Sequence, residues 1–310
     1  MEKKIPAQWE NDNILRLLEE PKNWEDHLIE DWWHQLKLQN KAYFKIQKAD
    51  DIPYFSVSQK MVHSVFTIGN ILQQTMDVQF LTIELLDRFL CNNYSSNKRS
   101  ILKNSELDSE KKRIIWLELK KDMKNTFLLR ILSCMQLASK YISNLKVIIP
   151  NEIQDSMRSF GYSVSIQEII KSERLVYKTC KFTVPTSPLV YIEHLIYMLP
   201  PAKIGTNKNM LYTLCAHILG LVYTNHKTIY DSLYHVVTSK KIRSKKDRMQ
   251  FLGVECDRIY LASAIVLCAA DLYQENFCWV LQRLEALTDI PLQDIEGFAA
   301  IINDCSLGKH

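Results

Sequence analysis

The spacing of the apolar side chains constrains this chain more than any other feature. From residue 56 onward they recur every three to four positions in one segment after another, and no window alternates as a half-buried strand does. Glycine occurs only seven times in 310 residues, which leaves few positions for the positive-φ turns of hairpins and phosphate-binding loops. Because 47% of the residues are hydrophobic, the chain can bury a sizeable core. The sequence therefore predicts an all-α protein.

The N-terminal region, residues 1–55, contains one amphipathic helix. Its apolar positions Trp24, Leu28, Trp32 and Leu36 recur at helical spacing within residues 23–43, and we expect this helix to dock on the rest of the chain. The tryptophan pair at 32–33 is either an anchor for a partner or a seal between this helix and its own domain.

Residues 56–186 are predicted to form a first unit of five helices. The expected helix ends are a capping box of Ser56 with Gln59, a cap at Asp77, Pro150 early in the fourth helix, a stop at Gly161, and a second capping box of Ser165 with Glu168. Residues 92–124 are polar and rich in charge, and we expect an inserted loop with a partial helix near residues 114–119.

Residues 187–310 are predicted to form a second five-helix unit, which begins after Pro185 and Pro188. The triplet Leu-Ala-Ser occurs at residues 137–139 and again at 261–263, in the third helix of each set. The predicted architecture is thus two consecutive five-helix units preceded by an N-terminal helix.

Several classes of protein find no support in the sequence. The motifs of dinucleotide, phosphate, esterase and zinc-protease sites are missing, and we expect neither catalysis nor a cofactor. Cys215, His217 and His226 fall short of a four-ligand metal set, so we interpret them as core residues. The eight cysteines form no CxxC pair and are interpreted as buried thiols in a reducing compartment. The N-terminus does not resemble a secretory signal, and residues 209–226 are interpreted as a core helix and not as a membrane span.

A basic segment spans residues 240–248 and is a candidate for phosphate contact or nuclear import; the alternative is a solvated loop between helices. Its basic residues are Lys240, Lys241, Arg243, Lys245, Lys246 and Arg248. The net charge of the whole chain is only +4, which argues against direct nucleic-acid binding.

Three motifs in the first unit resemble those of the cyclin family. The sequence LDRFL at residues 86–90 is similar to the end of the second helix of a cyclin box, and QLASKY at 136–141 is similar to the central third helix. Glu173, with Leu-Val at 175–176, Phe182 and Val-Pro-Thr at 184–186, is similar to the fifth helix and the segment directly after it. The resemblance covers about residues 56–186 and implies the cyclin fold, while the second unit resembles the second cyclin fold only in helix count and small-residue usage.

The cyclin resemblance implies that Lys140 and Glu173 bind a cyclin-dependent kinase by charge-assisted hydrogen bonds. Helical spacing places Glu173 on an apolar face with Ile169 and Val176, and a carboxylate there needs a partner. The alternative is that the two residues form an internal ion pair that only fixes two helices.

The chain departs from the cyclin pattern at its first helix. Cyclins usually open the box with MRxxLVDW, whereas residues 61–68 read MVHSVFTI, without the Arg, Asp and Trp. This departure puts the substrate-docking patch in doubt and favours a second hypothesis, a scaffold that assembles repair or recombination factors without a kinase. Within the family, the chain looks most like a member that matures meiotic crossovers, which implies meiotic recombination proteins as partners and a nuclear location on meiotic chromosomes, with a possible cytoplasmic pool.

Overall fold

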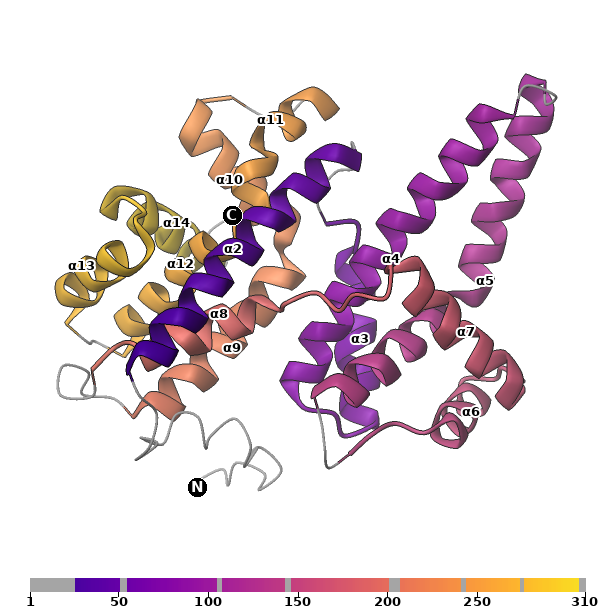
Figure 1. Ribbon diagram of the computed structural model, residues 1–310, viewed down its shortest axis with the longest axis horizontal. Helices are drawn as coiled ribbons and strands as arrows, with labels where there is room; N and C mark the ends of the chain where they lie inside the picture. Colours follow the sequence, from indigo (N-terminus) through magenta and orange to yellow (C-terminus); the bar gives the residue numbers. More distant parts are fainter. Residues whose placement is uncertain are drawn as a thin grey trace. The chain divides into compact units, whose positions relative to one another are not determined.

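The computed structural model describes residues 26–50, 55–104, 108–142, 146–200, 207–240, 244–273 and 276–306. These residues contain thirteen α-helices and no strand, so the prediction of an all-α protein is confirmed. The chain divides into two compact units (Figure 1). We call Phe55–Ser187 the box unit, and Met1–Tyr54 together with Pro188–His310 the split unit.

The box unit is built around helix α5. Its helices are α3 (Gln59–Ile71), α4 (Met76–Lys103), α5 (Ser109–Ile142), α6 (Pro150–Ser159) and α7 (Ile166–Thr179). The C-terminal half of α5 packs on α4, α6 and α7, and its Ile131, Leu132, Met135 and Ala138 are almost fully buried. The small Ala138 side chain lets neighbouring helices approach closely, as the narrow apolar stripe of this segment predicts.

Three of the predicted helix starts and ends in the box unit are confirmed. Pro150 is the first residue of α6. Gly161 follows α6 with φ of +83°, and the amides of Gly161 and Tyr162 donate to the carbonyl oxygens of Arg158 and Met157, which is the Schellman arrangement. The side chains of Ser165 and Glu168 each bond to the other's backbone amide at the start of α7.

Two predicted caps are displaced by two residues. Helix α3 begins after Ser58 and not after Ser56, whose backbone amide instead donates to the carboxylate of Asp87. Helix α4 is capped by Thr75, whose hydroxyl accepts from the amide of Val78, so Asp77 lies in the first turn. Several cap-forming residues lie within two positions of each other here, and tertiary contacts decide among them.

The prediction of an inserted loop at residues 92–124 is wrong. Helix α4 continues to Lys103 and α5 starts at Ser109, so both helices run through this polar segment as an antiparallel pair (Figure 1). Lys, Arg, Glu and Leu are good helix formers, and their intrinsic preference outweighs the lack of a broad apolar stripe.

The split unit is built around helix α12. Its helices are α2 (Asp26–Asp50), α8 (Pro188–Tyr197), α9 (Lys208–Thr224), α10 (His226–Thr238), α11 (Lys245–Glu255), α12 (Arg258–Leu272), α13 (Phe277–Thr288) and α14 (Leu292–Ser306). Helix α12 packs on α8, α9, α13 and α14, and nearly all of its side chains are buried. The second set therefore has seven helices among the described residues and not the predicted five, and α11 is one that the sequence reading missed.

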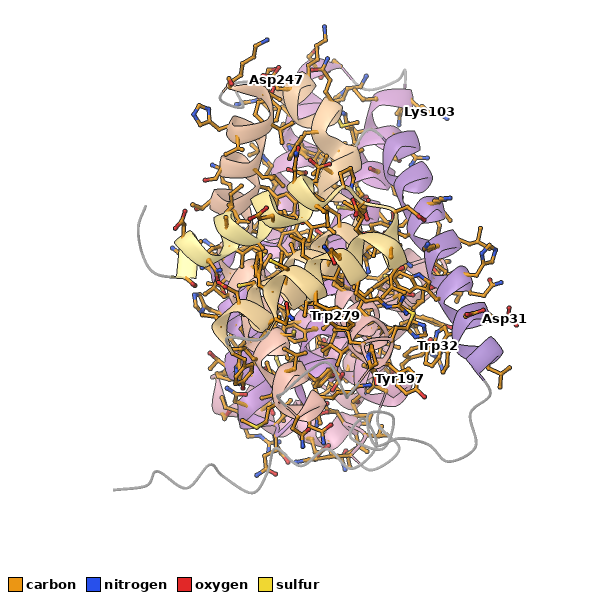
Figure 2. The ribbon with its side chains drawn as sticks, turned by 90° about the vertical axis from the view of Figure 1, so that its left-hand side faces the viewer. Asp31, Trp32, Lys103, Tyr197, Asp247 and Trp279 are labelled. Carbon is orange, nitrogen blue, oxygen red and sulfur yellow. The ribbon has the colours of Figure 1, made fainter. Side chains whose placement is uncertain are left out.

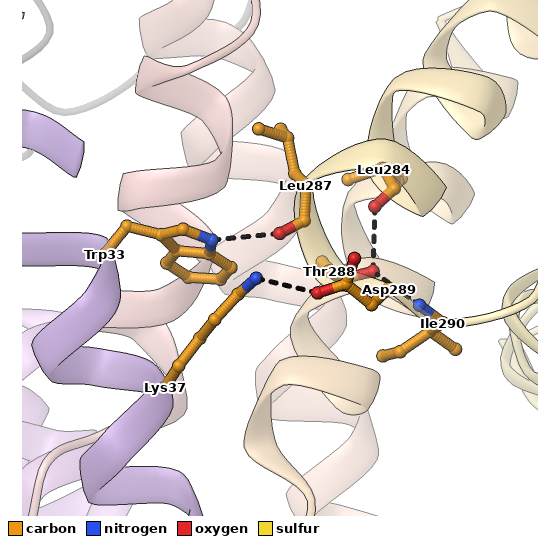
Figure 3. A network of polar contacts seen from close by, with 7 residues as sticks. All are labelled: Trp33, Lys37, Leu284, Leu287, Thr288, Asp289 and Ile290. Carbon is orange, nitrogen blue, oxygen red and sulfur yellow. Dashed lines mark hydrogen bonds and ion pairs between the residues drawn. The ribbon is translucent and has the colours of Figure 1, made fainter.

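The N-terminal helix α2 packs within the split unit, as Figures 2 and 3 show. The indole nitrogen of Trp33 donates to the carbonyl of Leu287 at 3.0 Å, and Lys37 pairs with Asp289 at 3.1 Å (Figure 3). The Trp33 ring also stacks on His194 with 5.5 Å between centroids. Trp33 therefore seals the helix onto its own unit.

Candidate functional site

The structure brings Lys140 and Glu173 together. Lys140 lies in the last turn of α5 and Glu173 in the middle of α7, and Lys140 Nζ is 2.5 Å from Glu173 Oε1. The two side chains differ in exposure: 44% of the Lys140 side chain is accessible to solvent but only 14% of that of Glu173. The pair therefore lies at the rim of the helix interface, with its cation toward the solvent.

Helix α7 starts at a capping box formed by Ser165 and Glu168. The side chain of Glu168 accepts hydrogen bonds from the backbone amide and the hydroxyl of Ser165, and these bonds lower the pKa of the Glu168 carboxyl. From that start, Ile169 and Val176 fall on one face and are fully buried. Glu173 lies between them in sequence and on the same face by helical register, and 14% of its side chain is accessible to solvent.

A second polar contact between α5 and α7 lies deeper than the ion pair. Arg130 donates to the hydroxyl of Ser172 at 2.6 Å, and the Ser133 hydroxyl is also 2.6 Å from that of Ser172. Burial lowers the pKa of the Arg130 guanidinium, with the negative charge of Asp122 acting in the opposite direction. Sequence reasoning missed this cluster, although small polar residues at 133 and 172 interrupt otherwise apolar stripes.

The end of α5 is fixed from the other side as well. The Ser139 hydroxyl donates to the carbonyl of Gln136 and accepts from the amide of Ile148 at 3.0 Å. Lys146 in the same connecting segment bonds to the side chain of Gln73 at 2.8 Å. The bonds of Ser139 tie the last turn of α5 to the segment before α6, so Lys140 extends from a supported helix end.

Exposed apolar side chains lie on the two helices that carry the ion pair, and one lies just after α7. Tyr141 is 67% exposed and follows Lys140 directly; Leu175 and Tyr177 are exposed on α7. Phe182, just after α7, is 63% exposed and meets Tyr177 edge to face at 5.3 Å. A carboxylate and an ammonium among exposed aromatic and aliphatic groups form a surface suited to binding a protein.

The start of the box departs from the cyclin pattern in a specific way. Val62 and Ile68 take the places of the Arg and Trp of MRxxLVDW, and both are buried among apolar neighbours. Helix α3 therefore docks through apolar contacts at positions where the pattern has an Arg and a Trp.

The basic segment is only partly described. Lys240 and Lys246 are exposed, whereas Lys241 and Arg243 lie outside the described residues, and the side chains of Lys245 and Arg248 are not described either. The expectation of a loop is wrong for its second half, because α11 begins at Lys245. A capping box of Ser244 with Asp247 starts this helix, which the sequence reading overlooked.

The metal-ligand candidates do not converge. Cys215 and His226 are buried, but His217 is exposed, so its assignment to the core is wrong. Among the described residues, no group of three or more His, Cys, Asp or Glu side chains is arranged to hold a metal ion. In the same part of the chain, no helix combines the length and apolar character needed to cross a bilayer.

The box unit has the features of a cyclin-like helical protein. Its five helices carry LDRFL on α4 and LASKY at the end of α5, and the Glu173 of α7 meets the Lys140 of α5. Comparison with known proteins confirms this resemblance. The chain is 29% identical over 262 residues to cyclin N-terminal domain-containing protein 1 of Mus musculus, covering 81% of this chain and 75% of the relative. It is also 29% identical over 255 residues to the protein of the same name from Homo sapiens, covering 81% and 76%. No family model matches the chain.

Proposed function

We propose that this chain is a non-catalytic regulatory protein that binds a cyclin-dependent kinase through Lys140, Glu173 and the exposed positions beside them on α5 and α7. The observation that carries the proposal is the ion pair itself, which lies at the rim of the α5–α7 interface with 44% of the Lys140 side chain exposed. An ammonium that is partly open to solvent can still be reached by a partner, whereas the cation of a fully enclosed pair cannot.

The arrangement suits a partner that arrives as a helix. In the free protein Lys140 satisfies the carboxylate of Glu173, so the half-buried charge has a partner before binding. A kinase helix can then receive charge-assisted hydrogen bonds from both groups, while the exposed Tyr141, next to Lys140, and Tyr177, one turn after Glu173, supply apolar area. Binding in this way biases the conformational equilibrium of a kinase and needs no catalytic group on this chain.

The cellular setting is proposed from the resemblance described above. A cyclin-like protein of this kind would act in meiotic recombination, in the designation or maturation of crossovers, with other recombination proteins as partners. Its place would be the nucleus, on meiotic chromosomes. The similarity to cyclin N-terminal domain-containing protein 1 over 81% of the chain supports the comparison on which this proposal rests.

The experiment is a pull-down from germ-cell extract, followed by identification of bound cyclin-dependent kinases and repetition with the purified kinase. The test variant is Lys140→Ala/Glu173→Ala. The matched control is Lys111→Ala/Asp108→Ala, which removes another ion pair of the box unit, 3.6 Å long and exposed on both sides. We expect the wild type and the control to bind a kinase and the test variant, shown to be folded by circular dichroism, to bind none.

A second candidate is a kinase-independent scaffold that assembles repair or recombination factors through the cyclin fold. The apolar Val62 and Ile68 at the start of the box favour it, because they replace the Arg and Trp of the cyclin pattern. If the wild type binds recombination proteins but no cyclin-dependent kinase, the kinase proposal fails and the scaffold takes its place.

A further inference from the structure

Helices α4 and α5 extend beyond the core of the box unit. We call residues 96–104 and 108–128 the arm. No side chain described in the arm is buried: the last buried residue of α4 is Ser95, and the first of α5 is Leu129. Figure 1 shows the two helices running side by side past α3, α6 and α7 of the same unit. The arm therefore adds little to the core, and its sequence is free to serve another purpose.

The arm holds the charge imbalance of the protein. Residues 96–128, which comprise the arm and the three residues between its two segments, contain nine Lys and Arg against five Asp and Glu, a net charge of +4, which equals the net charge of the whole chain. The remaining residues are therefore balanced. The ion pairs Lys111–Asp108 and Arg113–Glu110 lie near the tip, at the start of α5. A concentrated positive field on a projecting element attracts an acidic partner and repels a second copy of itself.

The outer side of α5 combines this charge with apolar groups. Ile114 and Leu117 lie three residues apart, on neighbouring turns of one face, and are 46% and 53% exposed. Arg113 lies on the turn before Leu117, while Lys121 and Lys124 lie on the turns after it. In a pair of helices, each helix covers only the side of the other that faces it. The outer side of α5 is therefore available to a third helix that carries acidic residues beside an apolar stripe.

The aromatic groups in and next to the arm argue against nucleic acid as the occupant. Tyr94 and Trp116 meet edge to face at 5.3 Å, and Lys98 and Lys120 lie 5.9 and 5.7 Å from the centroids of these rings. The rings are thus occupied by each other and by cations, whereas a base-binding platform needs an open aromatic face. Phosphates would also leave Ile114 and Leu117 unused.

We infer that the outer face of α5 in the arm, with Ile114 and Leu117 at its centre and Lys121 and Lys124 beside them, binds an acidic amphipathic helix of another protein. This surface is independent of Lys140 and Glu173, and the inference does not depend on kinase binding.

The test measures the binding of labelled synthetic peptides to the full chain by fluorescence anisotropy. Each peptide has about 20 residues, since shorter isolated helices are marginal in water. The first carries Leu on one helical face and Glu elsewhere, the second has Lys in place of Glu, and the third has the composition of the first in scrambled order. A short DNA duplex is the fourth probe.

Two variants and a control are compared with the wild type. Ile114→Ser/Leu117→Ser removes the apolar centre, and Lys121→Glu/Lys124→Glu reverses the charge. Because all four side chains are exposed, both variants should fold. The control is Val236→Ser/Val237→Ser on α10, where the two side chains are 64% and 63% exposed.

We expect the first peptide to bind about ten-fold or more tightly than the second and third, and each arm variant to weaken it by about ten-fold or more, which is about 1.4 kcal/mol. The control should bind as the wild type does. The inference is overturned if the Lys peptide binds equally well, if no peptide binds, or if the arm variants have no effect. It is also overturned if DNA binds the wild type more tightly than the peptides, with a steep salt dependence and no effect of Ile114→Ser/Leu117→Ser.

Discussion

The ion pair between Lys140 and Glu173 should contribute little to the stability of the free protein. Its cation is 44% exposed, and exposed pairs contribute about 0.2–1 kcal/mol because water screens the charges and the long side chains lose entropy. We therefore expect a coupling energy of about 0.5–1 kcal/mol in a double-mutant cycle of Lys140→Ala and Glu173→Ala.

The two single variants should differ in cost. Lys140→Ala leaves a carboxylate of which only 14% of the side chain is exposed, so we expect a loss of about 1–2 kcal/mol. Glu173→Ala leaves an ammonium that can turn into solvent, so its cost should be smaller. The comparison variant is Ser172→Ala, which removes the deeper contact to Arg130 and should cost about 1.5–3 kcal/mol, because that bond has a charged donor.

The assay is urea unfolding of the wild type, the two single variants and the double variant, with hydrogen exchange of the amides of α5 and α7 to assign the transition to the box unit. A coupling energy of about 3 kcal/mol or more would refute the reasoning, since that is the size expected of an enclosed pair. The pair would then be a structural bond, and the loss of kinase binding in its absence would carry no information about the surface.

Three further outcomes are expected at single positions. A Cβ on Gly69 would lie 2.6 Å from the Cγ of the buried Gln79, whose side chain donates hydrogen bonds to Gln74 and Asn70. In a urea titration, Gly69→Ala should therefore lower the free energy of unfolding by about 1–2 kcal/mol. Gly297 on α14 has open space around it, so Gly297→Ala should raise the free energy of unfolding by about 0.5–1 kcal/mol. Burial lowers the pKa of His194, against a hydrogen bond to Ile29, so the unfolded chain takes up more protons as the pH falls below about 6.5. The melting temperature of the split unit should therefore fall between pH 7.5 and pH 5 by more in the wild type than in His194→Gln, and an equal fall would contradict this role. Burial raises the pKa of Cys180 and Cys268 to about 12, so a thiol reagent at pH 8 should modify the exposed Cys278 first, and Cys278→Ser should abolish the fast phase.

Much of the box unit could be predicted because its sequence signals and its packing agree. Gly161 ends α6 in the left-handed conformation that glycine allows, and Ser165 with Glu168 starts α7 as its spacing predicts. The ion pair of Lys140 with Glu173 is the contact that the sequence offered as the alternative to kinase binding, since the register of α7 places the Glu173 carboxylate where it needs a partner. At these positions the local sequence preference and the tertiary packing favour the same structure, so the local signal alone is sufficient to predict it.

The arm and α11 could not be predicted from apolar periodicity, because α11 buries only a few side chains and the described residues of the arm bury none. In α11, the buried side chains among those described are Phe251, Leu252 and Glu255, all in its second half. In the arm, no described residue is buried at all, and the helices form through the intrinsic preference of their Lys, Arg, Glu and Leu residues. The cluster around Arg130 and Ser172 was not predicted for another reason. It joins residues about forty positions apart, which belong to no local sequence pattern.

The polar contacts between α5 and α7 are of two kinds: a deeper cluster that holds the helices together, and an ion pair at the rim of their interface. The bonds of Ser172 with Arg130 and Ser133, together with the buried Ile169 and Val176, fix the distance between the helices. Glu173 is the next residue after Ser172, so the contacts of Ser172 place it and its own ion pair is not needed for that. If the double-mutant cycle gives the small coupling energy expected above, it follows under our proposal that this pair can exchange its charges with those of a partner at little cost to the fold. A surface whose backbone is held rigidly, and whose charged groups can change their bonding partner, is pre-organised for binding.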